Sequence, residues 1–219
     1  MTLRTPPPSA SIAAPQNGEK LHAPSAARNS DDICALIQTL VPDHGTALEI
    51  ASGTGQHVTT FAAAMPNMHW HPTDVDPVRL TSIAAYINDL GLANIAPPVF
   101  LDATTKGWHA TVKPMDLIYL VNLLHLISAD ECRTLIHEAA QALTPNGALM
   151  LYGPFKRAGV LTSDGDAGFD ADLRAADPEI GYKDDLDIRA WLSDAGFQNV
   201  EWFEMPANNL VFVARSTGL

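Results

Sequence analysis

The chain has 219 residues, of which 47% are hydrophobic and 17% charged, and its formal net charge is -12. This length suits one domain with a full core, and the composition is that of an ordinary soluble globular protein. A surface that follows a nucleic acid backbone needs clustered cations, and no run of lysine or arginine occurs, so a nucleic acid partner is disfavoured. The longest strongly apolar stretch, residues 117–127, is too short to predict a membrane span.

The first 20 residues are rich in proline, alanine, serine and threonine. Such a composition buries too little apolar surface to offset the entropy lost on ordering, so we expect residues 1–20 to form a flexible tail. A secretory signal needs an apolar core, and Pro6-Pro7-Pro8 stands there instead. Cys34 and Cys132 lack any metal-binding or redox spacing. We therefore expect a cytoplasmic protein with two reduced thiols.

A first helix is expected before residue 42. Its apolar face is formed by residues at helical spacing, namely Ile33, Leu36, Ile37 and Leu40. Asn29, Ser30 or Asp31 can cap this helix, and Pro42 ends it.

The stretch from Ala47 to His57 reads as a short apolar strand, a glycine-rich turn and the start of a helix. The first backbone N–H groups of such a helix lack internal partners and point at whatever lies above the loop. Gly53 and Gly55 let the backbone come close to a ligand, because neither carries a side chain. The arrangement therefore predicts a nucleotide-type cofactor.

Two common phosphate-binding motifs fit this loop poorly. A dinucleotide fingerprint needs a third glycine where Val58 stands, and a P-loop needs a lysine, which is absent between Lys20 and Lys106. An acidic residue before a glycine loop, here Glu49, resembles instead the first motif of class I S-adenosylmethionine-dependent methyltransferases. Ala51 takes the place of the first of that motif's three usual glycines.

A second strand, acidic turn and helix follow the first. Residues 68–71 read as the strand, and Pro77 suits the first turn of a helix that reaches about Leu90. A carboxylate at the end of the second strand of a doubly wound sheet can accept both ribose hydroxyls, so we expect Asp74 to bind ribose. Asp76 is expected to cap the helix. The alternative is that both aspartates only cap.

Two further strands end in polar residues. Residues 99–101 form a short strand before Asp102, for which a solvent-facing role and a cofactor contact stay equally open. Residues 116–122 are almost continuously apolar, which is typical of a central parallel strand covered on both faces. Asn122 and His125 follow at its exit, which faces the cofactor in this topology, so both are candidates for contact with cofactor or substrate.

The second half of the chain continues the pattern. We expect a helix over 129–143, a strand over 148–152, and a turn outward at Gly153-Pro154-Phe155. Residues 161–181 are acidic and without a clear period, so we expect an insertion that acts as a lid or substrate wall. Its aspartates have the approximate spacing of a calcium loop, but Phe169 and Ala175 stand where that loop needs glycine and a bidentate acid, so no metal is expected.

The last elements are a helix opened by Asp184 or Asp185 and two runs, 200–203 and 210–213, that predict an antiparallel pair. Asn208 and Asn209 are expected to turn this hairpin. The order predicts an α/β fold: a Rossmann-like, doubly wound, seven-stranded, mostly parallel sheet with an antiparallel last strand. It forms a single domain over residues 21–219, with the acidic insertion near 161–181.

Four strings carry a closer resemblance: Arg28-Asn29, Ser52-Gly53-Thr54-Gly55-Gln56-His57, Tyr152-Gly153-Pro154-Phe155 and Pro206-Ala207-Asn208-Asn209. With them the chain, from about Leu21 to Arg215, is similar to a domain-of-unknown-function family grouped with the methyltransferase-like proteins. The resemblance implies the class I fold and S-adenosylmethionine as cofactor. It does not imply a substrate, because function does not follow from fold alone.

The resemblance also implies roles for single residues. The methionine half of the cofactor is expected among Glu49, Ser52, Gly53, Thr54 and Gly55. Asp74 is expected at the ribose and Asp102 at the adenine, with Asn122 also near the cofactor. The Arg28 guanidinium can pair with the methionine carboxylate, and a pairing with a surface acid is equally open.

Methyl transfer from a sulfonium needs little covalent help, and a general base only if the acceptor must lose a proton. The titratable candidates for a base are His125, His57 and Tyr152. Nothing resembles the Asn/Asp-Pro-Pro-Tyr string of amine-methylating nucleic acid enzymes, which favours a small-molecule or protein acceptor. Of these we expect a small molecule, with direct in-line transfer. The alternative is a non-catalytic S-adenosylmethionine-binding or regulatory module, and a nicotinamide oxidoreductase is a poor third.

Overall fold

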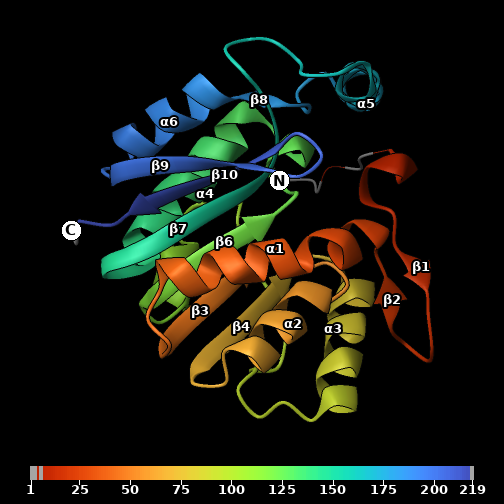
Figure 1. The fold of residues 1–219 in the computed structure, drawn as a ribbon, viewed down its shortest axis with the longest axis vertical. Helices are drawn as coiled ribbons and strands as arrows, with labels where there is room; N and C mark the ends of the chain where they lie inside the picture. The colour runs from red at the N-terminus through yellow and green to blue at the C-terminus, as the bar shows by residue number, and fades with distance from the viewer. Residues whose placement is uncertain (1–3, 5–6, 218–219) are drawn as a thin grey trace. The chain divides into compact units, whose positions relative to one another are not determined.

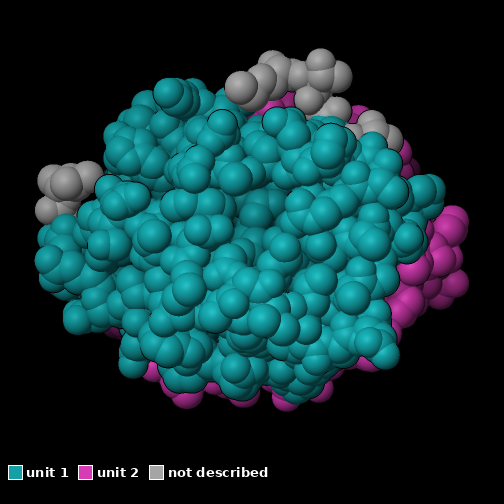
Figure 2. Space-filling view, turned by 90° about the horizontal axis from the view of Figure 1, so that it is seen from above, with its two compact units in different colours: residues 1–11, 103–114, 121–219 teal, residues 12–102, 115–120 magenta. Residues whose placement is uncertain are grey.

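The structure is a computed structural model that describes residue 4 and residues 7–217 (Figure 1). It divides into two compact units, coloured separately in Figure 2. Unit 1 comprises residues 1–11, 103–114 and 121–219, and unit 2 comprises residues 12–102 and 115–120. None of the helices in the described ranges is long and apolar enough to cross a membrane. The single domain expected over 21–219 stays a prediction.

Unit 2 is built on parallel strands in the order β5-β4-β3-β6. These strands are β3 (Gly45–Ile50), β4 (Met68–Asp74), β5 (Val99–Phe100) and β6 (Met115–Val121). Its helices are α1 (Pro24–Leu40), α2 (Gln56–Ala64) and α3 (Pro77–Leu90), of which α1 and α2 lie in front of β3 and β4 in Figure 1. Strand, loop and helix thus alternate here as the sequence predicts.

Three aromatic rings form the core beneath α2. Phe61 on α2 lies 6.0 Å from Trp70 and 5.6 Å from Tyr119, between ring centroids, and Trp70 meets Tyr119 edge-on at 6.0 Å. All three side chains are fully buried. Edge and tilted contacts of this kind add to the free energy gained by burying the rings, so α2 is held firmly on the sheet.

Helix α1 begins earlier than the capping residues suggested. It starts at Pro24, whose fixed φ suits the first helical turn, and Ala23 before it makes no side-chain cap. The expected start at Asn29 to Asp31 is therefore wrong. Ser30 lies inside the helix, where its hydroxyl donates to the Ala26 carbonyl at 2.6 Å.

The N-terminal segment holds more structure than its composition indicates. In unit 2, β1 (Ala14–Pro15) pairs antiparallel with β2 (Leu21–His22), and Figure 1 shows this hairpin beside α3. The Leu21 N–H donates to Ser82 Oγ at 2.8 Å, and the single O–H of Tyr86 is shared between two acceptors, Gln16 Oε1 at 2.7 Å and the Leu21 carbonyl at 3.1 Å. The flexibility expected of residues 1–20 stays a prediction, and residues 1–3 and 5–6 lie outside the described residues.

Part of the same segment is bound within unit 1. Residues Pro8–Ser11 form the 3-10 helix η1, and Arg4 donates to three carboxylates at 2.5 to 2.6 Å, those of Glu131, Asp177 and Glu179. Three acidic partners raise the pKa of this guanidinium above its usual range, against the effect of burial. The charge of Arg4 is thus well matched on the surface of unit 1.

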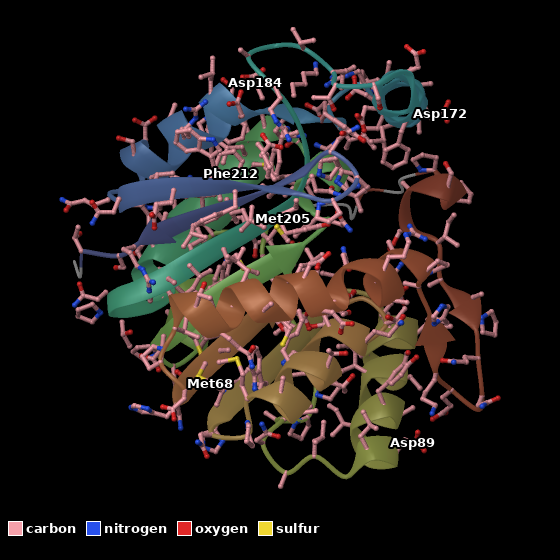
Figure 3. All side chains as sticks on the ribbon, in the orientation of Figure 1. Met68, Asp89, Asp172, Asp184, Met205 and Phe212 are labelled. Atoms are coloured by element: carbon pink, nitrogen blue, oxygen red, sulfur yellow. The ribbon has the colours of Figure 1, made fainter. Side chains whose placement is uncertain are left out.

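Unit 1 contains the antiparallel end of the fold. Its strands are β7 (Leu143–Lys156), β8 (Lys183–Asp184), β9 (Gln198–Met205) and β10 (Asn209–Arg215), and β10 runs antiparallel to both β7 and β9. Its helices are η2 (Trp108–Thr111), η3 (Leu124–Leu126), α4 (Ala129–Ala142), α5 (Asp164–Ala176) and α6 (Asp185–Asp194). Phe212, labelled on β10 in Figure 3, packs edge-on against Phe155 of β7 at 5.0 Å.

Strand β7 is longer than the sequence predicts. The expected outward turn at Gly153-Pro154-Phe155 is wrong, because these residues stay in the strand. Gly153 and Pro154 pair with Leu210 and Asn209 of β10, and Phe155 pairs with Lys183 of β8. Partners on both sides therefore keep extended a string that reads as a turn.

Helix α5 lies within the insertion, where no helix was expected. Ser163 caps it by accepting from the Asp166 N–H, and Phe169 and Leu173 on its inner face pack with Tyr182. The glycines and aspartates of this stretch are poor helix formers, so tertiary packing and the cap decide its structure.

The β9–β10 turn is formed as expected. Ala207 and Asn208 have φ values of 57° and 60°, and Asn209 side-chain nitrogen donates to the Pro206 carbonyl at 2.9 Å. Asn208 also donates to Asp166 at 3.1 Å. Both asparagines therefore serve the turn and its surroundings.

The hairpin contacts lead to the first test. We expect Tyr86→Phe to speed amide hydrogen exchange at Gln16 and Leu21 roughly fivefold, because it removes one shared O–H donor whose hydrogen bonding contributes about 1 kcal/mol. NMR-detected exchange measures this. Thr81→Ala is the control, since that hydroxyl bonds only within α3, to the Pro77 carbonyl. If these amides exchange at free-chain rates in the unmodified protein, the hairpin is not docked and the tail is flexible.

Candidate cofactor site

The loop between β3 and α2 has an unusual backbone. Ala51, Gly53 and Gly55 have φ values of 55°, 60° and 94°, and the Gly55 N–H closes the turn on the Ser52 carbonyl at 3.1 Å. Left-handed backbone costs an alanine roughly 1–2 kcal/mol relative to glycine. Ala51 therefore adopts, at an energetic cost, a left-handed conformation that favours glycine.

Hydrogen bonds tie this loop to the end of β4. The Ser52 N–H donates to the Thr73 carbonyl at 2.7 Å, and the Thr73 N–H donates to Ser52 Oγ at 3.0 Å. The next amide, that of Gly53, donates to Asp74 Oδ2 at 2.9 Å. The loop therefore brings Ser52 and Asp74 close together, and the hydrogen bonds of both residues shape it.

Asp74 is almost completely buried, and its carboxylate serves two backbone groups. Besides the Gly53 amide it accepts the Asp76 N–H at 3.0 Å. Burial raises the pKa of Asp74, while these hydrogen bonds and the nearby Arg79 lower it. A carboxylate has about four lone-pair sites, so Asp74 can accept further hydrogen bonds. Asp76 caps α3 by accepting from the Val78 N–H at 2.8 Å, as expected.

The two glycines of the loop are required for different reasons. A Cβ at Gly55 would lie 2.9 Å from the backbone Cα of Ile83 on α3, so the close approach there is to a helix. A Cβ at Gly53 would lie 3.2 Å from Nη1 of Arg79, the mobile end of a long side chain. Space above Gly53 can thus be opened to a ligand by a side-chain movement, whereas Gly55 secures the packing of α3.

Glu49 lies at the carboxyl end of β3 and is 2% exposed. Burial raises the pKa of its carboxyl to about 8, the neighbouring Asp74 adds to this, and Ser52 and Tyr119 oppose it. Its Oε2 atom has no hydrogen-bond partner of normal geometry among the described residues. A buried polar atom without a partner is unfavourable, and a ligand with a donor or a positive charge would satisfy it.

Exposed apolar residues gather close to Asp74. Phe100 of β5 pairs with Asp74 in the strand register and is 62% exposed, and Val78 at the start of α3 is 61% exposed. Asp102 follows two residues after Phe100. A flat aromatic base can stack on such a ring. Sequence reasoning missed Phe100, although an aromatic residue just before the strand-terminal Asp102 was a visible signal.

Gln56 and His57 connect the loop to the N-terminal part of unit 2. Gln56 Oε1 accepts from the Ala23 N–H at 2.7 Å and from the Thr54 hydroxyl at 2.9 Å, and its Nε2 lies 3.3 Å from Nδ1 of His22. Through these hydrogen bonds, the Thr54-Gly55-Gln56 part of the motif stabilises the contact between the loop and the residues before α1. The same hydrogen bonds connect Thr54, a predicted cofactor residue, through Gln56 with His22 of the hairpin.

His57 is buried on α2, and its Nε2 lies 2.8 Å from Oδ1 of Asn29 on α1. Burial lowers the pKa of His57 to about 4. Arg28 precedes Asn29 on the same helix and is exposed. Contacts thus place Asn29 beside the loop, while Arg28 faces solvent.

Three further candidates belong to unit 1. Asn122 has a φ of 58°, and its N–H donates to the Tyr152 carbonyl at 2.9 Å, so asparagine suits the left-handed exit of β6. His125 is buried on η3, with its ring 5.7 Å from Phe169 and 6.2 Å from Tyr182. Burial, with Lys183 nearby, lowers the pKa of His125 to about 3. Its ring is therefore a neutral, weakly basic group.

Comparisons with known proteins identify a family and a fold for this chain. A family model described as "Protein of unknown function (DUF938)" matches residues 20–216. A proposed O-methyltransferase from Nostoc punctiforme PCC 73102 superposes with a TM-score of 0.75 at 20% identity, covering 87% of this chain and 56% of that chain. Human N-acetylserotonin methyltransferase, solved in complex with SAM, gives 0.68 at 14% identity, with 87% and 52% covered.

A third solved structure is an O-methyltransferase family 2 protein from Planctomyces limnophilus DSM 3776 in complex with apigenin. It superposes with a TM-score of 0.68 at 16% identity, covering 88% of this chain and 61% of that chain. The chain thus spans only a little over half the length of these proteins. At such identities the likeness shows the fold alone. It confirms the predicted α/β class, a Rossmann-like doubly wound sheet, mostly parallel, with an antiparallel last strand.

The packing of Gly55 gives the second test. We expect Gly55→Ala to lower the free energy of unfolding by about 2–4 kcal/mol, through left-handed strain and overlap with Ile83. Gly91→Ala is the matched control, because Gly91 also has a positive φ, 62°, but nothing lies within 4 Å of its added Cβ. It should cost about 1–2 kcal/mol. Urea denaturation measures both, and equal costs would contradict the assigned contact.

Proposed function

We propose that this chain, which belongs to the DUF938 family, is an S-adenosylmethionine-dependent methyltransferase that acts on a small-molecule acceptor. The observation that carries the proposal is the glycine loop after β3, bound through the Gly53 amide to Asp74 at 2.9 Å and placed beside the buried Glu49. A close backbone, a second-strand carboxylate and an unpartnered acid together suit a cofactor with an adenosine and a cationic amino acid.

The side chains of unit 2 have the chemical groups that S-adenosylmethionine requires. Glu49, with its unpartnered Oε2, and the loop residues Ser52, Gly53, Thr54 and Gly55 would hold the methionine half. Asp74 would accept hydrogen bonds from the ribose hydroxyls. Asp102 and the ring of Phe100 would bind the adenine. The exposed Arg28 would pair with the methionine carboxylate.

The cofactor supplies a methyl group on a sulfonium, which leaves as a neutral thioether, with S-adenosylhomocysteine as product. The work of this chain is then positioning and the exclusion of water. His125 can take a proton only weakly, because burial and Lys183 hold its pKa to about 3. Together with Tyr152 it is a candidate to orient an acceptor. Because His125 is only weakly basic, these side chains favour direct in-line transfer to an acceptor that needs no strong base.

The small-molecule acceptor is supported by charge and by the structural neighbours. The net charge of -12 and the absence of basic runs oppose a nucleic acid. Among the neighbours, the Planctomyces limnophilus protein was solved with apigenin and the human enzyme is named for N-acetylserotonin. A cytoplasmic location belongs to the same proposal.

A non-catalytic S-adenosylmethionine-binding or regulatory module is the second candidate. The strained Ala51, at φ 55°, and the weak basicity of His125 favour it. Transfer of a labelled methyl group to a cell extract distinguishes the two. Turnover that depends on the protein would contradict the non-catalytic module.

The cofactor is tested by titration calorimetry with S-adenosylmethionine, S-adenosylhomocysteine and NAD. We expect micromolar binding of the first two and no binding of NAD, because the loop lacks the third glycine of a dinucleotide site. Binding of NAD alone would instead support an oxidoreductase and contradict the proposal.

The role of Asp74 is tested by substitution. We expect Asp74→Ala to weaken S-adenosylmethionine binding by about 1.5–3 kcal/mol, the scale of a lost hydrogen bond to a charged group. Asp76→Asn is the control, because asparagine also caps helices and Asp76 is assigned to α3 alone. Circular dichroism verifies that both variants fold. Unchanged affinity in folded Asp74→Ala would refute the ribose assignment.

A further inference from the structure

One face of the sheet in unit 2 holds three buried polar atoms that have no hydrogen-bond partner of normal geometry within the described residues, although Tyr119 lies close enough to Glu49 to lower the pKa of its carboxyl. These atoms are Glu49 Oε2, Trp70 Nε1 and the Tyr119 hydroxyl. Glu49 pairs with Tyr119 in the parallel register, and Trp70 pairs with Ala47, two residues before Glu49, so the three side chains share a face. Phe61 covers the two aromatic rings from α2. Trp70 and Tyr119 are fully buried beneath Phe61, so the atom that a ligand could satisfy is Glu49 Oε2, which is unfavourable without a partner.

The titratable groups around Glu49 supply no positive charge. On β4 the nearest is another acid, Asp74, and on β6 it is Tyr119, whose pKa burial raises well above its usual range. On the helices above, burial raises the pKa of Cys34 and lowers the pKa of His57 to about 4, so both are neutral near pH 7. Arg79 acts on Asp74, and no ion pair of the described residues includes Glu49.

A buried carboxyl beside a second acid and without a cation holds its proton. We propose that Glu49 is uncharged in the free protein and loses its proton when the cofactor enters, so that its carboxylate faces a positive charge of the cofactor. This inference rests on the proposed function, because it takes the cation from S-adenosylmethionine. The ligand chemistry is an organic cation, and its source is either the α-ammonium or the sulfonium.

The proton balance is simple. The O–H bond of the Glu49 carboxyl breaks, the proton goes to the buffer, and the carboxylate and the bound cation neutralise each other in a dry site. Between pH 6 and 8 the free protein must then give up this proton in order to bind. Affinity should therefore rise about tenfold per pH unit up to the pKa of Glu49, which is about 8, and level off above it.

The test is calorimetry at pH 7 in phosphate and in Tris, whose ionisation enthalpies differ, so that the released protons are counted directly. With a free pKa of about 8, the expected count is about 0.9 proton per S-adenosylmethionine bound. S-adenosylhomocysteine keeps the ammonium, and 5′-methylthioadenosine has neither cation. Release with both S-adenosyl compounds identifies the ammonium, and release with S-adenosylmethionine alone identifies the sulfonium.

Three outcomes overturn the inference. Binding of S-adenosylmethionine without proton release contradicts it and leaves the proposed function standing, as does equal release with methylthioadenosine. Failure of all three compounds to bind overturns the proposed function, and the inference with it. These experiments use the unmodified chain, so they do not depend on the folding of a variant.

A pair of neutral isosteres assigns the proton. Glu49→Gln should bind S-adenosylmethionine with no proton release and with affinity that is flat from pH 6 to 8. Asp172→Asn is the matched control, because Asp172 is exposed on α5 (Figure 3), and it should release the same proton as the unmodified chain. Continued release from Glu49→Gln would place the proton on another group and overturn the assignment.

Discussion

The hydrogen bond from the Gly53 amide to Asp74 fixes the geometry on which the rest of the site depends. It joins the turn after β3 to the end of β4, and the same carboxylate orders the turn that leads into α3 by accepting the Asp76 N–H. A charged acceptor strengthens both bonds. One buried aspartate therefore sets the loop, the start of a helix and the position of the carboxylate offered to a ligand.

The candidate residues divide between the two units. Those expected to hold the cofactor belong to unit 2, apart from Asn122, whereas His125 and Tyr152 belong to unit 1. Within unit 2, most of the predicted residues also have structural duties: Ser52 binds Thr73, and Gly55 makes room for Ile83. Loss of activity on substituting such residues will therefore mix binding with stability, and the two must be measured separately.

Local patterns were sufficient to predict much of this architecture. The strand, glycine loop and helix around Gly53, the cap at Asp76 and the cap at Asp184 each rest on chemistry within a few residues, and the structure has all three. Features that depend on distant partners could not be predicted. Strand β7 continues through Pro154 because β10 lies beside it, and the raised pKa of Glu49 depends on burial and on neighbours from two other strands.

The docked hairpin bears on how this protein should be prepared. Residues 1–20 are rich in proline, serine and alanine, a composition that would suggest removing them. A chain shortened there would lose the Gln16 partner of Tyr86 and the pairing of β2 with β1, and with them the support of His22 beside Gln56. Since Gln56 also receives the Thr54 hydroxyl, trimming for crystallisation would loosen the glycine loop itself. Material that keeps residues 7–20 is the sound choice for ligand studies.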